Sequence, residues 1–168
     1  MKLEEIDKAR YQKHLNIVMA TMAVAVLLLA LGTSTLLIHF FSTPGQSNFA
    51  FNLGGVVIAA IIVFSTVIKF RGHPFMKEVV YVWDLKQVLN KIHRKQLKLQ
   101  AAVEENDPDA LIIINFQYRG SRHLYQLDDN TITMDELAAK ILVHERLMKD
   151  AGLSTSTDEF DLSMLEKF

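Results

Sequence analysis

Two long segments without a charged side chain constrain this chain more than any other feature. Residues 15–41 (LNIVMATMAVAVLLLALGTSTLLIHFF) and 49–68 (FAFNLGGVVIAAIIVFSTVI) contain no Asp, Glu, Lys or Arg. A helix needs about 20 predominantly apolar residues to cross the hydrocarbon core of a bilayer, and both segments reach that length. Core helices of soluble proteins rarely run so far without a charge, and the first segment is too long for a signal peptide. The sequence therefore predicts two transmembrane helices.

The charged residues that flank these segments predict their orientation. The connection at 42–48 (STPGQSN) carries no charge, whereas Lys and Arg residues lie on the other side of both segments: Lys2, Lys8, Arg10, Lys13, Lys69, Arg71 and Lys77. Positive charge is retained on the cytoplasmic side of a membrane. We therefore expect a multi-pass protein of the bacterial inner membrane with both termini in the cytoplasm. Residues 1–14 would be a cytoplasmic N-terminal segment and 42–48 a short periplasmic loop. Lys69, Arg71 and Lys77 adjoin the second span and are candidate contacts for lipid headgroups.

Composition narrows the function classes. The net charge of −1 gives no basic excess of the kind that nucleic-acid binding needs. The absence of cysteine excludes disulfides, zinc–thiolate sites and thiol catalysis. No dinucleotide, P-loop, H-E-x-x-H or G-x-S-x-G pattern is present. We expect no cofactor and no nucleic-acid partner.

Residues 69–153 have the pattern of a cytoplasmic helical module. Over 74–105, apolar residues recur at three- and four-residue steps in a coiled-coil-like row of about three heptads, formed by Val82, Leu85, Leu89, Ile92, Leu99 and Val103. Asp107 and Pro108 predict the start of a second helix that runs to about residue 128. A capping box of Thr133 and Glu136 predicts a third helix, which continues to about residue 151.

The acidic tail at 154–168 forms either one short docking helix or a loose segment. No strand pattern is present. The fold class is therefore all-α: a two-helix transmembrane hairpin followed by a cytoplasmic antiparallel helical bundle.

The stretch QYRGSRHLYQLDDNT (residues 117–131) is the most polar part of the module, and it has two interpretations. In the structural one, Tyr118 and Tyr125 pack inward, the charged groups stay at the surface, and Gly120 marks a close helix crossing or a break. In the functional one, five groups form a catalytic or ligand site: Arg119, Arg122, His123, Asp128 and Asp129. As a metal site, the ligands would be His123, Asp128 and Asp129, with His93 and His144 as further candidates, but the expected helix register spreads the three histidines over about 13 Å along the axis. No metal site is expected.

The basic run KIHRKQLK (residues 91–98) is open to two interpretations as well. It is either a solvated helix face or, if its helix lies along a membrane surface, a contact for anionic lipid.

Three blocks of the chain resemble a known family. HPFMKEVVYVWDLK (residues 73–86) and GSRHLYQLDDNTITMDEL (residues 120–137) are similar to the two most recognisable blocks of a family of small bacterial inner-membrane proteins, catalogued as a domain of unknown function. The opening KLEEIDKARYQKHLN is similar to the N-terminus of that family. The resemblance implies a membrane protein with two spans, and it supplies no reaction, ligand or catalytic residue.

These observations favour an interaction or scaffold protein over an enzyme. A membrane hairpin would present a helical module to a partner, which is either a second copy in a homodimer or another membrane protein. The candidate partner contacts are Tyr118, Arg119, Arg122, His123, Asp128 and Asp129. The alternative is a membrane-bound enzyme or ligand sensor that uses the Arg119/Arg122/His123/Asp128/Asp129 cluster.

Overall fold

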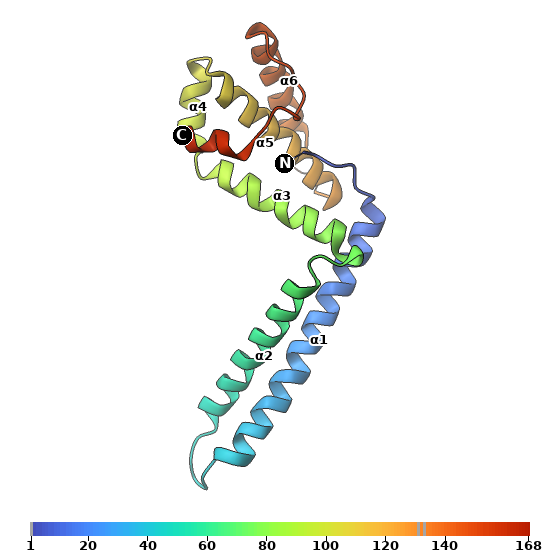
Figure 1. Cartoon of the computed structure of the whole chain (residues 1–168), viewed down its shortest axis with the longest axis vertical. Coiled ribbons are helices and arrows are strands. Elements are labelled where there is room, and N and C mark those ends of the chain that lie inside the picture. The colour runs from blue at the N-terminus through green and yellow to red at the C-terminus, as the bar shows by residue number, and fades with distance from the viewer. Residues whose placement is uncertain (1, 131, 133) are drawn as a thin grey trace. The chain divides into compact units, whose positions relative to one another are not determined.

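The computed structural model describes residues 2–130, 132 and 134–168, and every regular element in that part of the chain is a helix. The order is α1 (Lys8–Phe41), α2 (Phe49–Phe70), the 3₁₀ helix η1 (Pro74–Met76), α3 (Lys77–His93), α4 (Gln96–Glu104), α5 (Pro108–Leu127), α6 (Met134–Asp150) and the 3₁₀ helix η2 (Leu162–Lys167) (Figure 1). The all-α prediction is confirmed. The chain divides into two compact units. One is residues 9–80, the hairpin unit. The other is residues 2–8 with 81–168, and from here on the name module refers to these residues.

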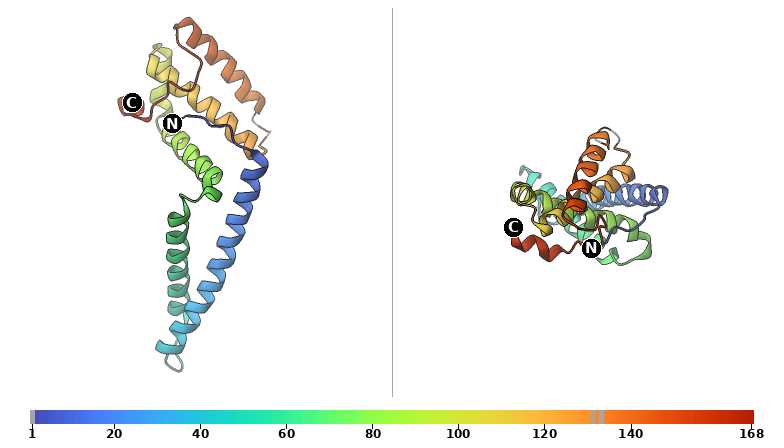
Figure 2. Two further views of the ribbon diagram at one scale, coloured as in Figure 1. Left: turned by 45° about the vertical axis from the view of Figure 1, so that its right-hand side comes forward. Right: turned by 90° about the horizontal axis from the view of Figure 1, so that it is seen from above.

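In the hairpin unit, α1 and α2 run antiparallel and side by side (Figures 1 and 2). Their connection turns at Gly45, whose φ of 87° lies in the left-handed region that favours glycine. Both helices are long and apolar enough to cross a membrane. α1 begins at Lys8, well before the charge-free segment, because the polar residues ahead of that segment continue the same helix.

A close contact between backbones joins the two helices near their connection. A Cβ atom built on Gly55 would lie 2.1 Å from Oγ of Ser34 and 2.7 Å from its backbone nitrogen. Oγ1 of Thr33 donates a 2.9 Å hydrogen bond to the Gly55 carbonyl. Oγ of Ser34 donates to the Asn52 carbonyl at 3.3 Å. Only a residue without a side chain permits this approach, which is how small residues bring helices together where lipid offers no hydrophobic drive.

In the module, α5 is the central helix. Half of its 20 residues are buried, and α4, α6 and η2 all pack against it. α3 approaches it at Gly120, where an added Cβ would lie 3.1 Å from Cδ2 of Leu89 and 3.4 Å from Cδ1 of Leu85. The sequence allowed a close crossing or a break at Gly120, and α5 remains unbroken there. This mid-helix glycine therefore marks a close crossing.

The single helix expected over 74–105 consists of three segments in the structure. η1 precedes α3, and turn residues at 94–95 separate α3 from α4. The interruption falls where Gln96 breaks the apolar row, and Oε1 of Gln96 accepts a 2.8 Å hydrogen bond from Nε2 of Gln117 on α5. Most of the row is buried within this chain's own core: Val82, Leu85, Leu89, Ile92 and Leu99.

The tail after α6 docks on the module. Phe160 stacks on Phe116 of α5 with ring centroids 4.0 Å apart, and Leu165 of η2 is buried. Nζ of Lys167 pairs with Oδ2 of Asp107 at 2.6 Å. Asp107 also caps α5 as expected, accepting a 3.1 Å hydrogen bond from the backbone nitrogen of Ala110. The residue expected to cap α6, Thr133, lies outside the described residues, as does Thr131.

Candidate functional site

A cavity of about 400 Å³ lies beside the middle of α5 and contains three of the predicted site residues. We call it the arginine pocket. Its lining consists of Leu3, Arg119, Arg122, His123, Gln126, Thr155, Ser156 and Thr157. It therefore joins the N-terminal segment, α5 and the loop after α6.

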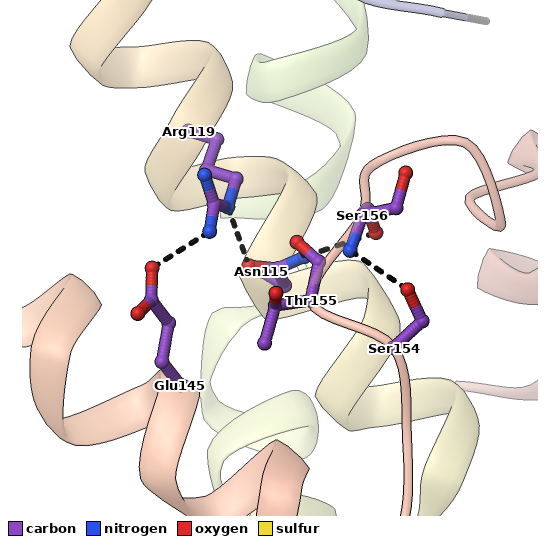
Figure 3. Close-up of polar contacts among 6 residues, drawn as sticks. All are labelled: Asn115, Arg119, Glu145, Ser154, Thr155 and Ser156. Carbon is purple, nitrogen blue, oxygen red and sulfur yellow. Dashed lines mark hydrogen bonds and ion pairs between the residues drawn. The ribbon is translucent and has the colours of Figure 1, made fainter.

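Asn115, one turn earlier on α5, organises one wall of this pocket (Figure 3). Its buried amide nitrogen donates to the carbonyls of Thr155 and Ser156 at 3.1 and 3.2 Å, while its Oδ1 accepts from Nε of Arg119 at 3.0 Å. Arg119 also forms a 2.7 Å ion pair with Oε1 of Glu145 on α6. The guanidinium of Arg119 is thus fixed and its charge is compensated inside the module.

Arg122 and His123 are the ionisable groups in the pocket that remain available to a ligand. Arg122 is exposed, and among the described residues it has no hydrogen bond or ion pair. Nε2 of His123 is buried and has no hydrogen-bond partner in the described part of the chain, while the ring makes an edge contact with Tyr81 at a centroid distance of 6.1 Å. Burial lowers the pKa of His123 from its usual value, so the neutral ring is favoured at neutral pH. The pocket therefore offers one uncompensated cation and one neutral imidazole.

The predicted aspartates do not join this pocket. Oδ2 of Asp128 pairs with Nζ of Lys86 at 2.8 Å, and Asp129 pairs with Lys8. Asp129 adopts a φ of 56° in the turn after α5. The structure thus brings three of the five groups of the functional interpretation into one pocket, while Lys86 of α3 and Lys8 at the start of α1 bind the other two, Asp128 and Asp129.

The histidines considered for a metal site have separate environments. His93 is exposed, whereas His144 is buried and its Nε2 lies 2.8 Å from the Leu111 carbonyl, to which it donates. Within the described residues, no group of three or more His, Asp or Glu side chains could hold a metal ion.

A second cavity, of about 470 Å³, lies between α4 and α6, with α5 as its floor. We call it the α4–α6 groove. It is lined by Gln100, Val103 and Glu104 from α4, Ile114 and Tyr118 from α5, and Glu136, Ala139, Lys140, Val143, His144 and Leu147 from α6. Tyr118 lies edge-on to His144 with ring centroids 5.6 Å apart. This confirms the expectation that Tyr118 turns toward another helix.

α6 carries two parallel rows of side chains that face different surroundings. One row is buried, formed by Leu137, Ile141, His144 and Met148. The neighbouring row lines the groove and leaves apolar groups uncovered, with Val143 60% and Leu147 37% exposed. Sequence reasoning missed these two residues, although a second apolar row beside the core row of α6 was a signal that could have found them.

The candidate headgroup contacts surround the junction of α2 and α3. Lys69 lies in the last turn of α2, Arg71 follows it, and Lys77 begins α3. All three side chains are exposed.

A comparison with protein-family models identifies the family to which the chain belongs. A model described as "Protein of unknown function (DUF3087)" matches residues 1–165 of the 168. The chain belongs to the DUF3087 family. No curated protein and no solved structure matches it. The family match covers both apolar helices and the module up to residue 165, so the arginine pocket and the α4–α6 groove both lie within the matched residues of this DUF3087 chain.

Proposed function

We propose that this DUF3087 chain is an integral membrane interaction protein. α1 and α2 anchor it in the bacterial inner membrane with both termini in the cytoplasm, and the module binds a partner protein. Support for the anchoring comes from the two long apolar helices and from Lys and Arg residues that flank them on the side away from the 42–48 loop.

The proposal that the module binds a partner protein rests on the α4–α6 groove. Its walls and floor are helices, its lining is largely apolar, and Val143 is mostly exposed beside it. An amphipathic helix binds such a groove by laying its apolar face along the floor. The charged groups at the rim, Glu104, Glu136 and Lys140, would pair with the polar face of that helix. The occupant is therefore an amphipathic helix of a partner protein.

A pair of neighbouring substitutions tests the groove. Val143→Asp places a carboxylate in the groove, whereas Leu142→Asp places one on an equally exposed part of α6 that does not line it; the two side chains are 60% and 61% exposed. We expect a protein that co-purifies with the full chain from native membranes to be lost with Val143→Asp and retained with Leu142→Asp. Equal behaviour of the two variants would contradict the groove as the binding surface. If the protein that is lost with Val143→Asp is a second copy of this chain, the groove is a surface for self-association.

The second candidate function is a sensor of a small anionic ligand. It is favoured by the unpartnered Nε2 of His123 beside Arg122 in the arginine pocket. Arg122→Gln should then abolish a rise in the melting temperature caused by the ligand, while Arg146→Gln on α6 should not. With inorganic phosphate as the probe, absence of any shift in the unmodified chain would count against phosphate groups as the ligand.

A further inference from the structure

Beyond the contact of Ser34 with Gly55, the hairpin unit contains a crevice of about 430 Å³ between α1 and α2. Its α1 wall extends from Ile17 to Leu29, and its α2 wall extends from Ile62 to Phe70. The crevice therefore lies on the side of the contact that is remote from the 42–48 loop. The left view of Figure 2 shows the two helices that enclose it.

The walls of the crevice are almost entirely apolar. The hydroxyl of Thr66, one of few polar groups there, donates a 2.8 Å hydrogen bond to the Ile62 carbonyl of its own helix. Such walls offer little to water, which needs several polar partners in a buried site. If the crevice were empty, the atoms that line it would lack dispersion contacts on that side. A flexible hydrocarbon chain would supply those contacts.

The length of the crevice matches one leaflet of a bilayer. At 1.5 Å of rise per residue, Ile17 to Leu29 spans about 18 Å along α1. A hydrocarbon core about 30 Å thick gives each leaflet about 15 Å. The crevice is thus as deep as the acyl chains of a single leaflet, and it lies at the end of the hairpin where the basic residues occur.

That end of the crevice favours a negative headgroup. His73, Phe75 and Met76 line it there, and Lys69 and Arg71 precede His73 in the chain. Residues 49–77 contain no Asp or Glu. Glu78, the nearest acidic residue in the chain, is buried and already paired with Arg10 at 3.0 Å and His14 at 3.3 Å.

We propose that the crevice binds an acyl chain of an anionic phospholipid from the surrounding bilayer, with the headgroup at Lys69, Arg71 and His73. The inference rests on the membrane anchoring in the proposed function. It assigns this part of the hairpin a ligand of defined chemistry, an anionic lipid in the leaflet that adjoins the basic residues.

Native mass spectrometry of the full chain tests the occupant. The protein is released from nanodiscs that contain phosphatidylglycerol and phosphatidylethanolamine in equal amounts. We expect a retained phosphatidylglycerol on the unmodified chain. Ala25→Phe fills the crevice and should abolish retention, whereas Ala23→Phe, on a part of α1 that does not line it, should preserve retention. The double substitution Lys69→Gln with Arg71→Gln should keep a bound lipid but remove the preference for phosphatidylglycerol.

A second measurement does not depend on variants. A phosphatidylglycerol with a photoreactive acyl chain should label crevice residues such as Met22 and Val67 of the unmodified chain more strongly than Ala23. The inference would be overturned by uniform labelling around α1 or by equal effects of the two phenylalanine variants. It would also be overturned if the protein retained a free fatty acid or a second copy of the chain in place of the phospholipid. A protein that alkaline carbonate removes from membranes would contradict the membrane anchoring itself. A chain that stays in the membrane and retains no lipid would overturn the lipid site alone.

Discussion

Asn115 is the side chain at which three parts of the module meet. Its amide binds the loop after α6 through the carbonyls of Thr155 and Ser156, and it positions Arg119, which continues the network to Glu145 on α6. Because the side chain is buried, each group that it satisfies would otherwise lack a partner in a region with little access to water.

Asn115→Ala should therefore destabilise the module. Removing one partner of a buried hydrogen bond costs about 1–3 kcal/mol, and here two carbonyls and Arg119 lose a partner together. We expect a clearly lower melting temperature of the full chain in detergent and faster proteolysis within 154–157. Asn90→Ala, at an exposed position of α3, is the matched control and should leave both measurements unchanged. Equal melting temperatures of the two variants would show that the network contributes nothing to stability.

The buried His144 should make the stability of the chain depend on pH. Burial lowers its pKa from the usual 6.5, although the hydrogen bond to the Leu111 carbonyl acts in the opposite direction. The unfolded chain therefore binds a proton at His144 more readily than the folded chain, and stability falls as the pH drops below about 6.5 until the folded pKa is passed. His144→Gln should flatten the pH dependence of the melting temperature over this window. Burial also lowers the pKa of His123, so this residue should account for part of the remaining pH dependence.

At the scale of elements, a glycine determines how closely α1 and α2 pack. Gly55→Leu should separate the two helices, because even the Cβ would overlap the backbone of Ser34. We expect the free energy of unfolding to fall by about 1–3 kcal/mol, the range typical of overpacking, or by more. Gly32→Leu is the matched control on α1, since a Cβ there meets nothing within 4 Å. Thermal unfolding of the full chain in detergent distinguishes the two, and an equal melting temperature would contradict the role of the contact.

The elements could be predicted from sequence to the extent that local patterns specify them. Charge-free length identified the two long apolar helices, and Asp107 with Pro108 identified the start of α5. The interruption between α3 and α4 was not predicted; it falls at Gln96, whose side chain bonds to Gln117 on another helix, a contact that local patterns do not specify. The candidate site was also predictable only in part, because some of its contacts join residues that are distant in sequence. Arg119, Arg122 and His123 share a helix and a pocket, but the lysines that bind Asp128 and Asp129 are distant in sequence.

For the whole molecule, the membrane orientation is the property with the clearest test. A cytoplasmic reporter fused after Phe168 should be active, and a reporter inserted in the 42–48 loop should behave as periplasmic, because Lys and Arg flank the helices only on the other side. Activity of a periplasmic reporter at Phe168 would contradict the proposed orientation. Replacing Lys69, Arg71 and Lys77 together by Gln should weaken the preference for this orientation, which the ratio of the two reporter activities measures.

The pairing of residues 2–8 with the rest of the module also has a consequence for the order of events during synthesis. The backbone nitrogen of Glu4 donates to Oη of Tyr81, 77 positions later, and Lys8 pairs with Asp129, 121 positions later. At about 5–20 residues per second, a ribosome adds Tyr81 about 4–15 s after Glu4. Both apolar helices are completed in that interval. Residues 4 and 8 therefore lack their native partners until both apolar helices have been made, and any factor that holds the nascent chain during this delay acts before the module can form.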